Sequence, residues 1–318
     1  MKKLIITADD YGYIDHIDEA IVNCVKKGAV TTVSCFAHVP EHNLKEKIDA
    51  LLHAFEEGGK TPGIGLHFTI TSGQPLTNSD RLSENGRFYP INEIALNRLR
   101  KNDIYHELEA QYDQLQTALD GRASVDHLSC HHGTVNYHRR SFNAYVSFAK
   151  TYQLPVRSPR MWTKFYLYKF ERDGVIDLLN ADIHEEGFRK KPKGVFRALR
   201  WMVRTSKGKL EAMEQQIRDA GLKTPDVLMD QIYGDPRLEW MEYYLKVLKS
   251  NIVAEQMMHV SVPYSLPAYK SGYHGINSDY FSGRMEEYNL MINPFYTQLC
   301  EEMLDGEELK TGTYRELL

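Results

Sequence analysis

Strand and helix patterns alternate through residues 4–70, and this alternation restricts the fold more than any other feature of the chain. Apolar and β-branched runs at 4–6, 29–39 and 63–70 predict strands, while apolar residues recur at helical spacing in 15–27 and 44–57. Gly28 and Gly58 stand where a glycine commonly ends a helix. Because strands separated by single helices pair in parallel, the sequence predicts an α/β fold.

The rest of the chain continues this pattern with two interruptions. We expect helices at 103–119, 142–152, 240–250 and 278–300, and strands at 124–130, 154–157, 226–232 and 253–262. Residues 75–100 are polar with an Asn85-Gly86 turn, and residues 160–225 combine helical patterning with a basic run at 189–200. Since no repeat or linker divides the chain, we predict a single domain over residues 1–318 with insertions near 75–100 and 160–225.

Two carboxylates, Asp9 and Asp10, follow the first predicted strand directly and precede Gly12. In parallel α/β folds the carboxyl ends of the strands form the edge where ligands bind. Adjacent strand residues point to opposite faces, so these side chains should diverge unless the backbone turns between them. Two buried carboxylates repel each other, and a cation or a shared proton would relieve that repulsion. The alternative is that Asp10 caps the next helix while Asp9 is solvated.

Composition argues against several classes of function. The formal net charge of -4 gives no case for nucleic acid as a general partner. No stretch approaches the roughly 18 apolar residues of a membrane-spanning helix. The four cysteines are scattered and form no Cys-x-x-Cys pair, which favours reduced thiols in a cytoplasmic protein.

Histidines recur at the ends of other predicted strands. His67, the pair His131-His132 and His259 each lie on or directly after a β pattern, as Asp9-Asp10 does. One Asp and two His suit a divalent metal such as Zn²⁺ or Mg²⁺, and a further carboxylate and His suit proton transfer. The competing interpretation is that these histidines are packed core or surface residues.

Three motifs resemble the YdjC-like (ChbG-type) carbohydrate deacetylases. They are Thr-Ala-Asp-Asp-Tyr-Gly at 7–12, Gly-Leu-His-Phe-Thr at 65–69 and His-Leu-Ser-Cys-His-His at 127–132. The resemblance continues through Leu-Pro-Val-Arg at 154–157 and the late strand with His259 to Ser-Asp-Tyr at 278–280 and Arg284. It spans nearly the whole chain and is weakest at about 160–225.

The resemblance implies a distorted (β/α) barrel related to polysaccharide deacetylases, with a loop-rich insertion face. It also implies metal-dependent hydrolysis of an N-acetyl group on a sugar, a chitooligosaccharide or a phosphorylated N-acetyl disaccharide. The implied metal ligands are Asp10, His67 and His131, with His132 as a substitute for His131. The implied catalytic residues are Asp9 as base, Arg157 orienting that base and His259 as general acid.

Two departures from the family pattern affect these assignments. The family often has Pro-Gly after its late histidine, whereas here Val260-Ser261 follows His259. The family commonly has Asp-Ser or Asp-Gly before its histidine pair, whereas here Ser129-Cys130 precedes it. The second difference removes a carboxylate that could support a metal ligand.

Other functions remain open at this point. A phosphoesterase or another metal hydrolase fits the same side chains, as does a non-catalytic sugar- or metal-binding barrel protein. The retained Asp9 argues against a pure binder, which has no need of it beside the ligands. The basic run at 189–200 and loop aromatics such as Trp162 suit an anionic group and a sugar ring. Apolar positions on the final helix suit a homodimer.

Overall fold

The computed structural model describes residues 1–12, 14–37, 44–90, 99–159, 207–229, 236–263, 278–301 and 308–318. The basic run at 189–200, Trp162 and most of the predicted insertion at 160–225 lie outside these residues. The single-domain organisation with its second insertion therefore stays a prediction.

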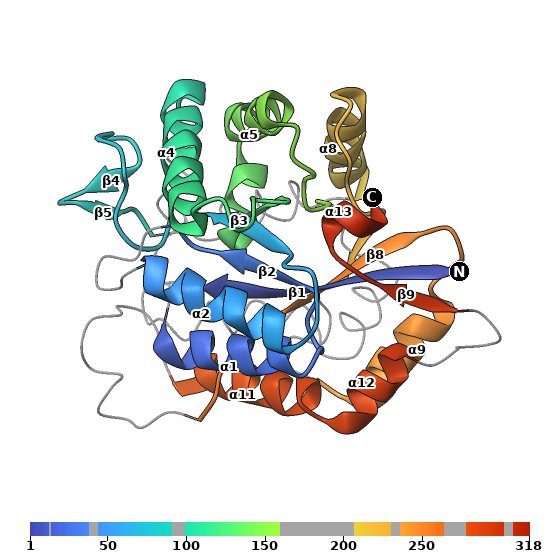
Figure 1. Cartoon of the computed structure of the whole chain (residues 1–318). Coiled ribbons are helices and arrows are strands. Elements are labelled where there is room, and N and C mark those ends of the chain that lie inside the picture. The colour runs from blue at the N-terminus through green and yellow to red at the C-terminus, as the bar shows by residue number, and fades with distance from the viewer. Residues whose placement is uncertain are drawn as a thin grey trace, which may run out of the picture.

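A parallel sheet organises the described part of the chain (Figure 1). Its strand order is β6-β3-β2-β1-β8-β7. Strand β9 pairs with the first residues of β1, and β2 pairs with the later residues of β1. All of these pairings are parallel, which confirms the predicted α/β class. The strands are β1 (Lys2–Tyr11), β2 (Thr32–Cys35), β3 (Ile64–Phe68), β6 (Leu128–Cys130), β7 (Val227–Met229), β8 (Val253–Met258) and β9 (Leu309–Thr311).

The sheet curls into part of a barrel, and one short segment bridges its two outer strands. Val156 pairs with Leu128 of β6 in parallel, and its backbone N–H donates to the carbonyl of Lys223 at 2.9 Å. Lys223 leads into β7, the strand at the other end of the order. The barrel is therefore distorted rather than regular, since a single residue connects the two edges where a full strand would otherwise lie.

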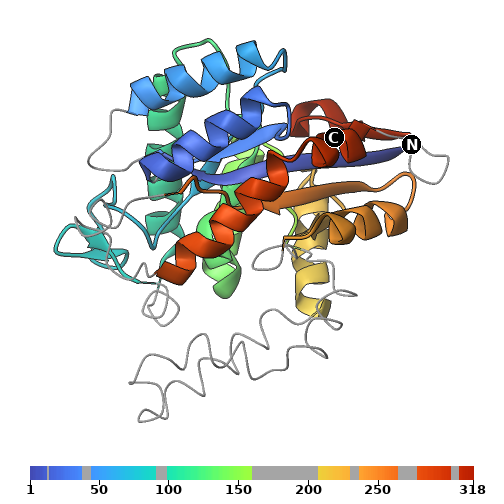
Figure 2. The same cartoon turned by 90° about the horizontal axis from the view of Figure 1, so that it is seen from below.

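Helices cover the outside of the sheet. In Figure 1, α4, α5 and α8 lie above the strands and α1, α2, α9, α11 and α12 below them, with α1 and α11 side by side in Figures 1 and 2. They are α1 (Asp15–Lys26), α2 (Leu44–Glu57), α4 (Lys101–Leu119), α5 (Arg139–Tyr152), α8 (Lys207–Asp219), α9 (Leu238–Val247), α11 (Ser278–Met291), α12 (Pro294–Glu301) and α13 (Tyr314–Leu317).

Three predictions about these elements need correction. The single helix expected at 278–300 is wrong, because Pro294 has no backbone N–H to continue a helix and instead begins α12. The strand expected at 253–262 ends at Met258, so His259 follows β8 rather than lying within it. The sequence pattern also predicts neither β9 nor α13, which together form the C-terminal segment 308–318.

The insertion predicted near 75–100 contains a small hairpin. Strands β4 (Ser83–Glu84) and β5 (Arg87–Phe88) pair in antiparallel fashion. Asn85 and Gly86 join them with φ of 52° and 73°. Two central residues with positive φ make the type of tight turn that Asn-Gly favours, so the predicted turn is confirmed.

Alternate residues of β1 face two different cores. Leu4, Ile6 and Ala8 belong to the large apolar cluster under the helices, whereas Ile5 packs with Val253, Tyr314 and Leu317. Period-two alternation thus divides each strand between an outer face toward the helices and an interior face inside the curled sheet. The interior face is where the polar residues of the strands collect.

The four cysteines, all within the described residues, form no disulfide with one another. Among the described helices, none has both the length and the apolar character needed to cross a membrane.

The interior face of β3 has a glycine because a histidine ring occupies the space beside it. A Cβ on Gly65 would lie 2.0 Å from the ring of His127. That ring cannot move aside easily, because Asp126 accepts from its Nδ1 at 2.6 Å and Ser34 bonds its Nε2 at 3.1 Å. Gly65 is therefore required by packing, two residues before His67 on the same face.

We expect Gly65→Ala to lower the free energy of unfolding by about 1–3 kcal/mol, the usual cost of overpacking a core. Gly208→Ala is the matched control, because Gly208 is exposed in α8 and a Cβ there meets nothing within 4 Å. Urea unfolding of both variants measures the difference. Wild-type stability of Gly65→Ala would contradict the packing assigned to His127.

Candidate metal centre and active site

The carboxyl ends of β1, β3 and β6 bring three of the predicted ligands together. Asp10 is the residue before the last of β1, His67 lies on β3 and His131 follows β6. All three are buried. The predicted catalytic residues Asp9, Arg157 and His259 lie around the same point, with His259 directly after β8.

A bulge in β1 explains how both acids reach this point. Between Ala8 and Tyr11 the strand advances three residues while β2 advances two, from Val33 to Cys35. Asp10 takes up the extra residue with φ of 72°, in the left-handed region. The bulge breaks the alternation that would turn Asp10 outward, so its carboxylate joins Asp9 inside the barrel.

The alternative assignment of these acids as a helix cap and a solvated residue is wrong. Both side chains are buried, and Ile14 occupies the N-cap of α1 without a side-chain hydrogen bond. The two side chains were expected to diverge unless the backbone turned between them, and the bulge with the positive φ of Asp10 is such a turn.

Three potential ligand atoms form a compact triangle. Asp10 Oδ1 lies 3.2 Å from His67 Nε2 and 3.0 Å from His131 Nδ1, and the two ring nitrogens are 3.3 Å apart. A metal with bonds of about 2.0–2.1 Å places neighbouring ligand atoms about 2.9–3.4 Å apart in octahedral or tetrahedral geometry. The triangle has the size that a divalent cation requires.

The hydrogen bond to Ser129 fixes the tautomer of His67. Ser129 Oγ lies 2.7 Å from His67 Nδ1 and donates its own proton to the carbonyl of Leu66 at 3.4 Å. Ser129 therefore accepts from Nδ1–H, which leaves the lone pair of Nε2 directed into the triangle. Burial also lowers the pKa of His131 against the opposing effect of Asp10, which favours a neutral ring there.

Asp10 divides its two oxygens between different partners. Oδ2 accepts from Arg284 on α11 at 2.5 Å, whereas the buried Oδ1 receives no hydrogen bond of acceptable geometry. Burial works to raise the pKa of Asp10, but His131 and Arg284 hold it well below its ordinary range. An ionised, buried oxygen that faces two imidazole nitrogens fits a metal ligand, and these donors suit Zn²⁺ or a similar divalent ion.

Arg157 and Asp9 form a bidentate ion pair. Nη1 donates to Asp9 Oδ2 at 2.6 Å and Nη2 donates to Oδ1 at 2.8 Å. Burial alone would raise the pKa of Asp9, but Arg157 and His67 lower it. Asp9 is therefore ionised at neutral pH, and the bidentate ion pair with Arg157 fixes its orientation.

His259 also lies near Asp9. Its Nε2 is 4.0 Å from Asp9 Oδ2, and its backbone N–H donates to Glu287 of α11 at 2.7 Å. Burial and the nearby Arg284 lower the pKa of His259 to about 4. The ring is therefore neutral at pH 7 in the site as it stands.

The structure distinguishes the two neighbouring histidines. His131 lies in the triangle, whereas His132 is exposed and its Nδ1 bonds Thr71 Oγ1 at 3.1 Å. His132 also has φ of 55°, which turns its backbone away from the β6 direction. His131 is thus the member of the pair that the geometry favours as a ligand.

Besides Arg284, which the resemblance included without a role, three residues of the site escaped the sequence-based assignment. Ser129 supports His67, Glu255 accepts from Arg157, and Tyr314 donates to Glu255. The alternation of side chains along a strand could have identified two of them. Ser129 stands two residues before His131, and Glu255 stands four residues before His259, so an even spacing relates each to a predicted site residue. Nothing in the local sequence around Tyr314 points to the site.

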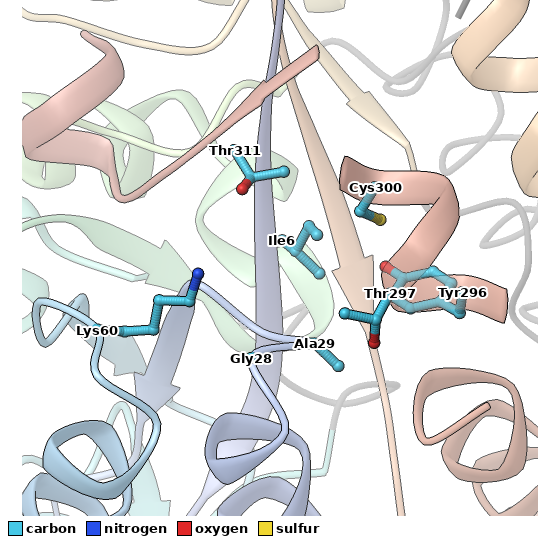
Figure 3. A pocket seen from close by; sticks show the side chains of 8 residues that line it. All are labelled: Ile6, Gly28, Ala29, Lys60, Tyr296, Thr297, Cys300 and Thr311. Atoms are coloured by element: carbon cyan, nitrogen blue, oxygen red, sulfur yellow. The ribbon is translucent and has the colours of Figure 1, made fainter. Parts of the chain in front are cut away.

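A small cavity elsewhere is unrelated to this chemistry. It has a volume of about 30 Å³ and lies between β1, α12 and the loop at Gly28-Ala29 (Figure 3). Its lining includes Ile6, from the outer face of β1, and Lys60. That volume is about the share of one liquid water molecule, so the cavity is too small for a sugar.

Comparison with a solved structure supports the fold. A crystal structure of a putative cellobiose-phosphate cleavage protein from Enterococcus faecalis V583 superposes with a TM-score of 0.71. The alignment covers 99% of this chain and 98% of that one at 19% identity. At such identity the likeness shows a shared fold, in agreement with the distorted barrel.

Comparison with curated proteins gives several relatives with related names. The carbohydrate deacetylase of Geobacillus stearothermophilus is 30% identical over 58% of this chain and 69% of its own length. That of Thermoanaerobacter pseudethanolicus is 27% identical over 50% of this chain and 61% of its own. The chitooligosaccharide deacetylase of Proteus mirabilis is 31% identical over 50% of this chain and 59% of its own length. The chain thus spans about three fifths to two thirds of the lengths of these relatives.

A family model extends the relationship over nearly the whole chain. The model of the YdjC-like proteins matches residues 3–302. That range contains Asp9, Asp10, His67, His131, Arg157 and His259. The chain therefore belongs to the family of YdjC-like proteins.

Proposed function

We propose that this protein is a metal-dependent carbohydrate deacetylase, which hydrolyses the amide of an N-acetylated sugar and releases acetate. The observation that carries the proposal is the triangle of Asp10, His67 and His131 beside the ionised Asp9. The relatives named carbohydrate and chitooligosaccharide deacetylase support the same conclusion.

Each residue has a role that follows from its position. Asp10, His67 and His131 would hold a divalent cation, which when bound acidifies water and polarises a carbonyl. Asp9 accepts the proton of the water that attacks the amide carbon, and Arg157 keeps its carboxylate directed at that water.

Proton transfer to the leaving group completes the reaction. Because His259 is neutral at pH 7, it is in the form that receives a proton. Its Nε2 lies 4.0 Å from Asp9 Oδ2, too far for direct transfer, so the proton taken from water would reach His259 through one bridging water and then pass to the sugar nitrogen. The C–N bond breaks as the nitrogen is protonated, and the products are acetate and the free amine.

The substrate we propose is a chitooligosaccharide or a phosphorylated N-acetyl disaccharide. We also propose that the protein is cytoplasmic. The four scattered cysteines, which form no Cys-x-x-Cys pair, support a reducing compartment. A homodimer remains part of the proposal, supported by Phe295 of α12, which is 65% exposed. Light scattering on the purified protein measures the oligomeric state.

Acetate release from N,N′-diacetylchitobiose and its longer homologues tests the activity. We expect wild type to release acetate, a chelator to stop the release and Zn²⁺, Co²⁺ or Mg²⁺ to restore it. His67→Ala should abolish the activity, whereas the control His53→Ala, on the exposed surface of α2, should keep it. Phosphate release from a phosphorylated sugar without acetate would instead favour a phosphoesterase. Tight sugar binding with no product would favour a binding protein.

Asp9→Asn separates metal binding from catalysis. The amide cannot accept the proton, so we expect kcat to fall by about 10²–10⁴-fold. Zn²⁺ binding, measured by calorimetry, should persist because Asp9 is outside the ligand triangle. An Asp9→Asn enzyme with wild-type kcat would exclude Asp9 as the base.

Ser129→Ala tests the support of His67. Loss of the hydroxyl releases the Nδ1–H that fixes the ring, so we expect Zn²⁺ affinity to fall by about 10–100-fold. Ser147→Ala is a control, because its hydroxyl donates to the carbonyl of Asn143 within α5. Equal Zn²⁺ affinities of Ser129→Ala and wild type would show that this hydrogen bond does not tune the ligand.

A further inference from the structure

The contacts that orient Asp9 continue beyond Arg157. Glu255, buried on the interior face of β8, accepts from Arg157 Nε at 2.9 Å and from Nη2 at 2.7 Å. The guanidinium is therefore held on two edges, one by each carboxylate. It cannot rotate toward Asp9 or away from it without losing hydrogen bonds to Glu255.

The other oxygen of Glu255 is held by the C-terminal segment 308–318. The hydroxyl of Tyr314, a fully buried residue, donates to Glu255 Oε2. Burial and the nearby Glu255 hold the pKa of Tyr314 well above its ordinary value, so the phenol keeps the proton that it donates. The contacts therefore run without a break from Tyr314 through Glu255 and Arg157 to Asp9.

Tyr314 is itself fixed in place. Its ring stacks on that of His127 with centroids 4.2 Å apart and an interplanar angle of 2°. It begins α13, whose N-terminus carries a capping box formed by Thr313 and Glu316. Packing under the ring and a capped helix together leave the phenol little freedom to move.

We infer that Glu255 and Tyr314 are positioning residues for Asp9, an inference that rests on the proposed function of Asp9 as the base. Arg157 pairs with both Glu255 and Asp9, so its positive charge is divided between the two carboxylates. The guanidinium therefore orients the Asp9 carboxylate without fully neutralising its charge. Tyr314 holds Glu255 in the geometry that this sharing requires.

The inference assigns a role in catalysis to a segment outside the matched family region. The family model ends at residue 302, and Tyr314 lies beyond it. The competing explanation is that Tyr314 only fills the amino end of the barrel, with Ile5, Val253 and Leu317 around it. Loss of the hydroxyl alone distinguishes the two, because filling depends on the ring and positioning depends on the hydrogen bond.

Tyr314→Phe, with Tyr296→Phe as the matched control, tests the inference. Tyr296 is equally buried but belongs to α12 and lies near Ile6 on the outer face of β1. In an enzyme that releases acetate, we expect Tyr314→Phe to lower kcat by about tenfold while KM and Zn²⁺ affinity stay within twofold of wild type. Glu255→Gln should lower kcat further. Wild-type kcat in a folded Tyr314→Phe would overturn the inference.

A second readout does not depend on activity. The Arg157 Nε–H resonance in ¹⁵N-arginine-labelled protein should shift and exchange faster in Tyr314→Phe, but not in Tyr296→Phe, because Glu255 accepts that proton. An unchanged resonance in Tyr314→Phe would overturn the inference. If wild type released no acetate while this resonance moved, the proposed activity would fail and the structural coupling would stand.

Discussion

The buried guanidinium of Arg157 is the interaction on which the interior of this barrel depends. It lies between Asp9 of β1 and Glu255 of β8, and both carboxylates are almost completely buried. Without a cation between them, these acids would lose their hydration and repel each other, at a cost of several kcal/mol for each unpaired charge. Arg157 follows Val156, the residue that bridges β6 to the segment before β7. Closure of the barrel and ionisation of the acids therefore depend on the same short stretch of chain.

Local sequence patterns were sufficient to predict which strand ends meet. They were insufficient to predict how the backbone turns between Asp9 and Asp10. Strand ends in a parallel sheet share one edge, so the pairs Asp9-Asp10 and His131-His132 could be placed near His67 from the pattern, whereas the choice of Asp10 and His131 as ligands came from the family resemblance. The same rule of alternation directed Asp9 and Asp10 apart. The bulge that reunites them arises from the register between β1 and β2, which is a tertiary property that the sequence of β1 does not display.

The residues missed by sequence reasoning are those whose partners are distant in the chain. Tyr314 contacts Glu255, which is 59 residues away, and an isolated tyrosine near a terminus carries no pattern that suggests such a contact. Glu255 could have been identified in principle, because a charged residue within a buried strand requires a buried partner. The break before Pro294 was also accessible, since proline rarely continues a helix.

The geometry around Asp9 explains why two adjacent acids can serve different purposes. Asp10 presents one oxygen to two imidazole nitrogens within about hydrogen-bonding distance, which is the arrangement of a ligand. Asp9 Oδ2 instead stands 4.0 Å from both His67 Nε2 and His259 Nε2, too far for a direct hydrogen bond to either. Arg157 occupies only part of the lone-pair capacity of the Asp9 carboxylate, so an acceptor site remains. A water placed between the triangle and Asp9 would therefore meet an ionised acceptor on one side and a proton-receiving ring beyond it.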